Sequence, residues 1–189
     1  MSNIHPDVDR MLFSAEEIEA CLRAMGAEIT AHYRDEPPVV ICVLKGAVYV
    51  VSDLTRYIDA DIELDFMVVS SYGSDTKTSG VVRIIKDLDM SIEGRHVLVI
   101  EDVIDSGLTL KYLLRNFAAR GARSVEVAAL FWKRGAQKID IHARWIGFEI
   151  EDEYIVGYGL DYNQKYRNLP YVGVIKPKII ASHSSKECM

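Results

Sequence analysis

The stretch VLVIEDVIDSGLTL, residues 97–110, joins an apolar run to a group of acidic residues and a polar turn. The run VLVI has the composition of a buried strand, and Glu101, Asp102 and Asp105 follow it within five positions. The small and hydroxyl residues of 106–109 come next. In open parallel sheets ligands bind at the carboxyl ends of strands, so this stretch predicts a functional site.

The turn after the acids predicts a site for a phosphate group. Ser106 and Gly107 open a helical pattern, whose first backbone N–H groups have no intrahelical partner and whose dipole favours an anion. The hydroxyls of Ser106 and Thr109 add further donors. The P-loop pattern of Gly, four residues, Gly-Lys and Ser or Thr is not met, which argues against triphosphate hydrolysis of that type. A phosphate monoester fits this turn best.

The three acids need partners other than phosphate, because carboxylates repel it. Glu101 and Asp102 have the chemistry to accept hydrogen bonds from two ribose hydroxyls and to share Mg²⁺, which prefers a few carboxylates together with phosphate oxygens. Asp105 is then free to accept a proton. A single acid at a strand end more often caps a helix or faces water, but an ordered group of three favours the functional interpretation.

Strand and helix patterns alternate on both sides of this stretch. The spacing predicts helices over 14–33, 47–58 and 107–120, and strands over 39–44, 62–69, 81–88 and 124–131. Ser14 and Glu17 form a capping-box pattern at the start of the first helix, and Gly121 is a stop signal for the third. This alternation predicts an α/β protein with a mainly parallel twisted sheet and helices on both faces.

The length of 189 residues is typical of a single domain. We expect its core over residues 10–132 and a small lobe formed mainly by 133–176, where short strand-like pieces and aromatic residues replace helical patterns. The polar tail 181–189 is expected to be disordered. The segment 70–80 is small, polar and glycine-containing, which is typical of either a mobile loop or a plain hairpin connection.

The composition predicts a soluble, cytoplasmic protein. With 28 acidic and 22 basic residues the net charge is −6, so we expect no nucleic-acid partner, although a local basic pocket can hold a small anion. Cys21, Cys42 and Cys188 show neither metal-ligand spacing nor a disulfide framework, which fits a reducing compartment. The N-terminus lacks a signal pattern, and no apolar run approaches the roughly 20 residues of a membrane span.

The quoted stretch resembles the phosphoribosyl pyrophosphate motif of the type I phosphoribosyltransferases. Four other segments resemble the hypoxanthine-guanine phosphoribosyltransferases of that group, in order and over residues 10–176: VLKGA (43–47), SSYG (70–73), FWKR (131–134) and VGYGLDYNQKYRNLPYVGV (156–174). The resemblance implies the type I phosphoribosyltransferase fold, with a C-terminal hood lobe. It also implies Mg²⁺-dependent transfer of 5-phosphoribosyl from phosphoribosyl pyrophosphate to N9 of hypoxanthine or guanine, giving IMP or GMP and pyrophosphate.

The same resemblance implies roles for single residues. Glu101 and Asp102 would bind ribose and Mg²⁺, and the 5-phosphate loop would be Asp105, Ser106, Gly107, Leu108 and Thr109, with Asp105 also the general base near purine N7. Pyrophosphate would bind to Lys45, Gly46 and Arg167. The peptide in the Lys45-Gly46 loop is often cis in this family. The purine site would be Lys133, Tyr154, Ile155 and Asp161, the last also serving a second metal. Ser71 and Tyr72 would belong to a closing lid. Lys133 would donate to purine O6, so adenine is expected to be a poor substrate.

Several alternatives stay open on the sequence. A phosphoacceptor receiver domain also gathers acids and Mg²⁺, but its acid pair should follow the first strand, whereas Glu101 and Asp102 lie midway along the chain. A phosphoribosyltransferase-like RNA-binding regulator would need a basic face, which the net charge of −6 disfavours. The sequence does not distinguish this enzyme from a related one that prefers xanthine. It also leaves open whether Asp105 accepts the proton or only orients the base. The family resemblance implies a homodimer or a homotetramer.

Overall fold

The computed structural model describes residues 4–71, 82–133, 135–136, 139 and 141–184. Its strands are β1 (Val8–Phe13), β2 (Val39–Leu44), β3 (Glu63–Ser71), β4 (Val82–Lys86), β5 (His96–Ile104), β6 (Ser124–Lys133), β7 (Trp145–Ile150), β8 (Ile155–Val156) and β9 (Val172–Ile175). Its α-helices are α1 (Ala15–His32), α2 (Val48–Leu54), α3 (Leu108–Ala119) and α4 (Pro177–Ser184), and a 3₁₀ helix, η1 (Thr55–Tyr57), follows α2.

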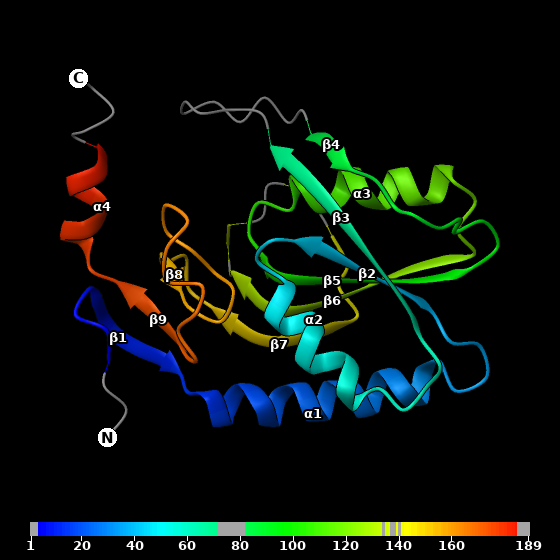
Figure 1. Cartoon of the computed structure of the whole chain (residues 1–189), viewed down its shortest axis with the longest axis horizontal. Coiled ribbons are helices and arrows are strands. Elements are labelled where there is room, and N and C mark those ends of the chain that lie inside the picture. The colour runs from blue at the N-terminus through cyan, green and yellow to red at the C-terminus, as the bar shows by residue number, and fades with distance from the viewer. Residues whose placement is uncertain (1–3, 72–81, 134, 137–138, 140, 185–189) are drawn as a thin grey trace.

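A mixed but mainly parallel sheet forms the centre of the molecule. Over the described residues its six strands run in the order β4-β3-β2-β5-β6-β7. Every neighbouring pair is parallel except β3 and β4, which are antiparallel at one edge. Helices α1 and α2 lie on one side of the sheet and α3 on the other (Figure 1). This confirms the predicted α/β architecture with helices on both faces.

Successive residues of the central strands feed two separate hydrophobic cores. In β2, Val40 and Cys42 point into the cluster under α1 and α2. Val39, Ile41 and Val43 belong instead to the cluster under α3. Side chains of a strand alternate between the faces of its sheet, so a strand covered on both sides must be apolar throughout. The continuous run VVICVL is therefore the expected sequence for this position.

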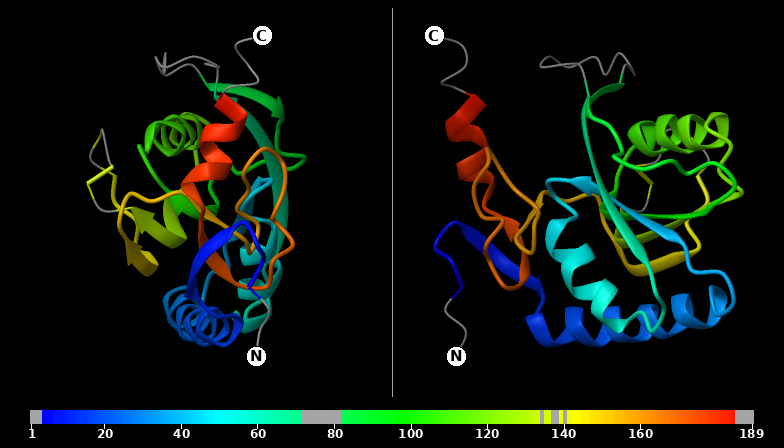
Figure 2. Two further views of the ribbon diagram at one scale, coloured as in Figure 1. Left: turned by 90° about the vertical axis from the view of Figure 1, so that its left-hand side faces the viewer. Right: turned by 45° about the vertical axis from the view of Figure 1, so that its right-hand side comes forward.

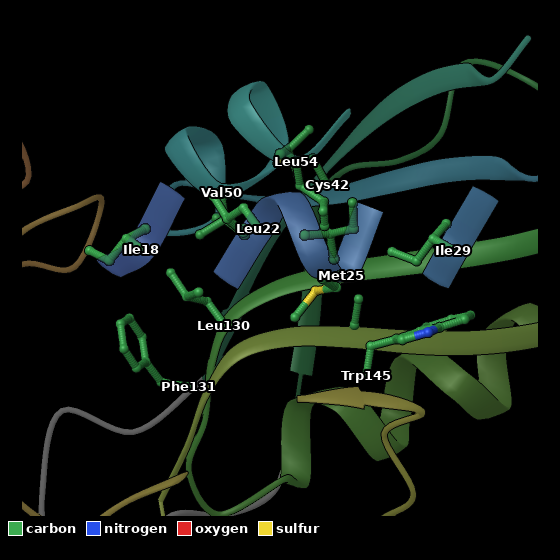
Figure 3. Close-up of a cluster of buried hydrophobic side chains, with 14 of the residues drawn as sticks. Ile18, Leu22, Met25, Ile29, Cys42, Val50, Leu54, Leu130, Phe131 and Trp145 are labelled. Atoms are coloured by element: carbon green, nitrogen blue, oxygen red, sulfur yellow. The ribbon is translucent and has the colours of Figure 1, made fainter. Parts of the chain in front are cut away.

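Helix α1 begins and packs as its sequence predicts. The Ser14 side chain accepts a hydrogen bond from the Glu17 N–H, and the Glu17 carboxylate accepts one from the Ser14 N–H, so the capping box is complete. Figure 3 shows its apolar side chains directed at the sheet, with Ile18, Leu22, Met25 and Ile29 on the helix and Cys42, Leu130, Phe131 and Trp145 on the strands.

Within the described chain, no helix combines the length and apolar character required to cross a membrane.

A smaller lobe is built from both ends of the chain. Its sheet has the order β1-β9-β8, with β9 antiparallel to both neighbours. Figure 2 shows this lobe beside the main sheet, with β1 and β9 close together although they lie at opposite ends of the sequence. Strand β1 was not among the elements expected from the sequence. Its six residues are a strand because β9, far away in the chain, supplies the hydrogen-bonding partners.

Strand β7 changes the expected division between core and lobe. The lobe was expected to be formed mainly by 133–176, but β7 lies in this range and pairs in parallel with β6 in the main sheet. The pairing satisfies its backbone and buries Trp145 and Ile150 against the core under α1. The lobe therefore draws on the chain after Ile150 and on the N-terminal β1, rather than on one continuous segment.

The C-terminal segment begins with a helix that overlaps the first four residues of the tail 181–189, for which disorder stays a prediction. Helix α4 extends from Pro177 to Ser184, and proline is well suited to the first turn of a helix. Ile179 and Ile180 pack against a third apolar cluster in the lobe, and the Tyr162 hydroxyl donates to the Ile180 carbonyl at 3.2 Å. Residues 185–189 lie outside the described part of the chain.

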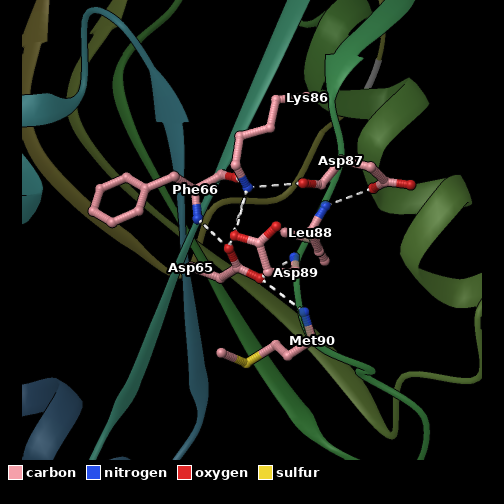
Figure 4. A network of polar contacts seen from close by, with 7 residues as sticks. All are labelled: Asp65, Phe66, Lys86, Asp87, Leu88, Asp89 and Met90. Atoms are coloured by element: carbon pink, nitrogen blue, oxygen red, sulfur yellow. Dashed lines mark hydrogen bonds and ion pairs between the residues drawn. The ribbon is translucent and has the colours of Figure 1, made fainter.

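A buried carboxylate fixes the antiparallel edge of the main sheet. Asp65 of β3 is 3% exposed, and it accepts hydrogen bonds from the backbone N–H groups of Phe66, Asp89 and Met90 at 2.7, 2.8 and 3.2 Å. The ammonium of Lys86, in β4, lies 3.7 Å from the same carboxylate (Figure 4). Asp65 thus ties β3 and β4 to the loop that leads into β5.

Candidate active site

The carboxyl ends of three adjacent parallel strands form the floor of the site. Strand β2 ends at Leu44, β5 at Ile104 and β6 at Lys133. Because these strands are parallel neighbours, the polar residues that end each of them meet at one edge of the sheet. The smaller lobe lies against this edge, since Tyr154 and Asp161 of the lobe line a cavity together with Asp102 and Lys133.

The acid pair at the end of β5 is half-buried and has few hydrogen-bond donors around it. Burial raises the pKa of Glu101 well above its usual value, and the neighbouring charge of Asp102 raises it further. Burial also raises the pKa of Asp102 from 3.8 to about 6, although the Val103 N–H donates to its carboxylate at 2.8 Å and opposes this. The pair therefore holds charge poorly unless a ligand supplies donors or a cation.

The turn after β5, which the sequence predicts to bind a phosphate, lines a cavity. A cavity of about 210 Å³ is lined by residues of this turn and its neighbours, among them Glu101, Asp105, Ser106, Gly107 and Thr109. Helix α3 starts here without a side-chain cap, so the positive end of its dipole faces the cavity. Gly107 has φ +77°, a left-handed conformation that favours glycine, and a Cβ on it would also lie 2.5 Å from the end of the Ile141 side chain.

The loop after β2 approaches the acid pair closely. The peptide between Leu44 and Lys45 is cis, as the family resemblance implies. Gly46 packs directly on the Asp102 carboxylate, because a Cβ on Gly46 would lie 1.8 Å from Asp102 Oδ2. The Lys45 side chain is exposed, with Nζ 3.4 Å from Gln164 Oε1 of the lobe. The structure therefore brings the predicted pyrophosphate loop beside the predicted ribose and Mg²⁺ acids.

Gly159 makes a close contact with the loop after β2, which was not predicted from the sequence. It has φ +98°, and a Cβ on it would lie 2.0 Å from the Gly46 carbonyl oxygen. The lobe thus touches the loop after β2 through two glycines, one on each side. The available sequence signal was the glycine two positions before Asp161, but its meaning depends on a contact across more than half of the chain.

A second cavity has the residues expected to hold a flat base. It has a volume of about 270 Å³ and is lined by Asp102, Val103, Asp105, Lys133, Tyr154, Ile155, Leu160 and Asp161. The Tyr154 ring is 48% exposed, and it meets the Tyr162 ring edge-on at 5.2 Å between centroids. Ile155 is buried at 5% and starts β8. All four residues predicted for the purine site therefore converge.

Asp105 lines both cavities, and the ammonium of Lys133 faces its carboxylate. The distance from Lys133 Nζ to Asp105 Oδ2 is 3.5 Å. A second carboxylate, that of Asp152 in the loop between β7 and β8, lies closer, at 3.1 Å from Nζ. Asp152 was missed in the sequence, where it stands in the acidic run EDE (151–153) with the pattern of a solvated surface. Its partner is 19 positions away, and no local signal marks the pair.

Arg167 and Asp161 form an ion pair in the lobe, with 2.8 Å between Nη2 and Oδ1. Arg167 also donates to the Gly159 carbonyl at 2.7 Å, and the Gln164 N–H donates to Asp161 at 2.7 Å. The charge of Arg167 lowers the pKa of Asp102 and that of Asp161 raises it, so both lie within electrostatic reach of the strand-end acids. Arg167 is therefore near the site but held by protein partners.

The lid prediction lies almost entirely outside the described residues. Ser71 is the last residue of β3, and Tyr72 belongs to the segment 72–81 that the structure does not describe. The predicted roles of Ser71 and Tyr72 therefore stay predictions.

The acids expected to hold Mg²⁺ do not form a closed metal cage. Among the described residues, no group of three His, Cys, Asp or Glu side chains is placed to bind a metal ion. Asp102 and Asp161 share one cavity, whereas Glu101 lines the other. A sparse set of carboxylate oxygens fits Mg²⁺, which usually keeps several waters and is shared with substrate phosphates.

Comparison with known proteins defines the class first. The phosphoribosyl transferase domain model matches residues 10–163. The hypoxanthine-guanine phosphoribosyltransferase of Bacillus subtilis (strain 168) is 52% identical over 176 residues, covering 93% of this chain and 98% of that protein. The protein of the same name from Streptococcus thermophilus (strain CNRZ 1066) is 49% identical over the same shares of the two chains.

Solved structures agree with these relatives. A crystal structure of a hypoxanthine phosphoribosyltransferase from Staphylococcus aureus superposes with a TM-score of 0.91 and 42% sequence identity, covering 95% of this chain and 98% of that one. The chain therefore belongs to the hypoxanthine-guanine phosphoribosyltransferase family.

Proposed function

We propose that this chain transfers 5-phosphoribosyl from phosphoribosyl pyrophosphate to N9 of hypoxanthine or guanine, giving IMP or GMP and pyrophosphate. The observation that carries the proposal is the position of Asp105, which lines both the phosphate cradle and the cavity with the base-binding residues. A sugar phosphate in the first cavity and a base in the second would meet beside this carboxylate. Family membership supports the same reaction.

The phosphoribosyl end is assigned to the turn after β5. Ser106, Gly107, Leu108 and Thr109 offer backbone N–H groups and hydroxyls to the 5-phosphate at the start of α3. Glu101 and Asp102 accept hydrogen bonds from the ribose hydroxyls, which add to the single Val103 N–H that donates to this pair among the described residues. A carboxylate whose pKa is raised by burial gains most from such partners.

Mg²⁺ is assigned to Glu101, Asp102 and Asp161 together with substrate oxygens, and in this family it accompanies phosphoribosyl pyrophosphate. When bound, it neutralises charge on the pyrophosphate leaving group. Lys45, the Gly46 backbone and Arg167 complete the pyrophosphate site. Arg167 must exchange its contact with Asp161 for one with the substrate, and a guanidinium suits both partners because it binds carboxylate and phosphate in the same geometry.

The base is assigned to the cavity between β6 and the lobe. Tyr154 stacks on the purine, Ile155 presents its backbone to the ring edge, and Lys133 donates to O6. A 6-amino group would offer Lys133 a donor where it needs an acceptor, so adenine is rejected. During transfer, the bond from the anomeric carbon to pyrophosphate oxygen breaks, the bond to N9 forms, and Asp105 accepts the proton that leaves N7.

The remaining features are proposed from the sequence and the family. Ser71 and Tyr72 close over the bound substrates and exclude water, which would otherwise hydrolyse the activated sugar. The chain acts as one domain, in the cytoplasm, and assembles as a homodimer or homotetramer. Light scattering after size-exclusion chromatography measures the assembly directly, and a monomer at micromolar concentration would overturn that part.

The function is tested by incubating the protein with Mg²⁺, phosphoribosyl pyrophosphate and each of hypoxanthine, guanine, xanthine and adenine. We expect nucleotide and pyrophosphate in equal amounts with hypoxanthine and guanine, and little product with adenine. Product with xanthine alone would keep the 6-oxopurine class but replace hypoxanthine and guanine by xanthine as the base. Absence of product with every base would reject the transferase.

A further inference from the structure

Two carboxylates lie near the Lys133 ammonium at different distances, and the proposed reaction gives a role to only one of them, Asp105. The Lys133 side chain is only 12% exposed, and its ammonium lies 3.5 Å from Asp105 and 3.1 Å from Asp152. Both carboxylates are largely exposed, at 57% and 66%, but Asp105 lines both cavities, whereas Asp152 is not among the residues that line the base cavity. Of these two carboxylates, the one nearer to the Lys133 ammonium is therefore the one that has no place in the reaction.

The position of Asp152 in the fold links two parts of the base cavity. Lys133 is the last residue of β6, and Asp152 lies in the short loop that joins β7 to β8. Tyr154 and Ile155, which line the base cavity, follow Asp152 within three residues. An ion pair between Lys133 and Asp152 consequently sets how far the ammonium lies from the ring and backbone that hold the other edge of the purine.

We propose that Asp152 is a positioning residue for purine recognition, which holds the Lys133 ammonium toward O6 and stays its counter-ion when Asp105 turns to the base. The proposal rests on the proposed function, because it assigns Asp152 to the step in which Lys133 meets the 6-oxo group. Asp152 touches neither substrate and acts through Lys133.

The need for a second carboxylate follows from the chemistry of the first. A mostly buried ammonium must keep a negative partner, since an uncompensated charge in such a place is costly. If Lys133 depended on Asp105, the ion pair would draw Oδ2 of the carboxylate that must face N7 of the purine toward the ammonium instead. Asp152 removes this competition, because its hydrogen bond to Lys133 at 3.1 Å persists while Asp105 changes partner.

The adjacent acid supplies a matched control. Glu153 pairs with Arg10 of β1, with 2.7 Å from Nη2 to Oε1, and so faces the lobe rather than the base cavity. Glu153→Gln removes one negative charge from the same loop without touching Lys133. A general effect of loop charge would appear in both variants, whereas positioning of Lys133 would appear in Asp152→Asn alone.

The test compares steady-state kinetics of wild type, Asp152→Asn, Asp152→Glu and Glu153→Gln. For Asp152→Asn we expect KM for hypoxanthine to rise about three- to tenfold, a modest effect because Asp152 is largely exposed, with KM for phosphoribosyl pyrophosphate unchanged. Asp152→Glu should recover most of the loss, and Glu153→Gln should behave as wild type. An unchanged hypoxanthine KM, or equal rises in both KM values, would overturn the proposal.

A double-mutant cycle with Lys133→Gln separates positioning from a structural effect. If Asp152 acts through Lys133, Asp152→Asn should add little to the defect of Lys133→Gln. Full additivity, or an Asp152→Asn melting temperature several degrees lower with a normal KM, would reject the positioning role. Wild-type protein that forms no nucleotide rejects the proposed function itself, whereas an active wild type with an unaffected Asp152→Asn rejects only this inference.

Discussion

Two regions of the main sheet bury carboxylates, and they differ in the partners they provide. Asp65 meets three backbone N–H groups and the Lys86 ammonium. Asp102 accepts one such hydrogen bond, from Val103, and among the described residues no donor lowers the pKa of Glu101. A fully partnered carboxylate stabilises the fold, whereas a sparsely partnered one at a strand end is available to a ligand.

The largest effect is expected from removing an acid at the second region, the end of β5. Asp105→Asn should lower the rate of nucleotide formation by roughly tenfold to a thousandfold, because the amide cannot accept the proton from the purine. Phosphoribosyl pyrophosphate should still bind, since the cradle of Ser106 to Thr109 is unchanged. Single-turnover kinetics together with calorimetric titration measure both. A wild-type rate would remove Asp105 from the role of base.

The corresponding change in the first region, the antiparallel edge of the main sheet, removes the carboxylate of Asp65. Asp65→Asn should lower the free energy of unfolding by about 3 kcal/mol, because the amide loses the pairing with Lys86 and turns a donor toward backbone N–H groups. Urea unfolding measures this loss. Activity per folded molecule should stay near wild type, and a stable variant with a large catalytic defect would erase the distinction between the two regions.

The same distinction explains how much the sequence predicted. The strands and helices around the main sheet were predictable because periodicity and caps, such as Ser14 with Glu17, are local signals. The contiguous stretch from Glu101 to Thr109 was predictable as a cluster for the same reason. By contrast, β1 and the sheet membership of β7 depend on partners elsewhere in the chain.

Within the site, the residues missed are also those with distant partners. Asp152 has meaning only beside Lys133, and Gly159 only against the carbonyl of Gly46. A pattern read along one chain contains neither contact. The convergence of the predicted residues is a finding of the structure, while the roles assigned to them stay predictions until the variants are measured.

A smaller effect is expected at Gly46, whose backbone lies against the carboxylate of Asp102. Gly46→Ala should raise KM for phosphoribosyl pyrophosphate by about tenfold, because the new methyl group must displace the Asp102 carboxylate, 1.8 Å from where the Cβ would lie. KM for hypoxanthine should change less. Gly26→Ala is the matched comparison: its Cβ would lie 2.7 Å from the Tyr57 carbonyl oxygen, so we expect lost stability with unchanged KM values. Unchanged kinetics in Gly46→Ala would separate the loop from Asp102.

The smallest expected change in stability is a gain, in the variant Asp102→Asn, which should lose most of its transfer activity. Folding raises the pKa of Asp102 from 3.8 to about 6, mainly through burial. The folded state therefore binds more protons than the unfolded state between these values, so the ligand-free wild type loses stability as pH rises through them. Below pH 3.8 both states are protonated, and the carboxylate contributes nothing.

Asp102→Asn lacks this titration while keeping an oxygen for the Val103 N–H. The variant should match wild type near pH 4 and exceed it above pH 6, with transfer activity largely lost. We expect about 1 kcal/mol rather than the roughly 3 kcal/mol of the full pKa shift, because solvent screens a half-buried carboxylate. Urea unfolding of the ligand-free proteins at pH 4, 5, 6 and 8 measures the difference. Adding Mg²⁺ and phosphoribosyl pyrophosphate should reverse the order at pH 8, because only the wild type then binds a ligand that stabilises the folded state. A difference independent of pH would mean that folding does not change the pKa of Asp102.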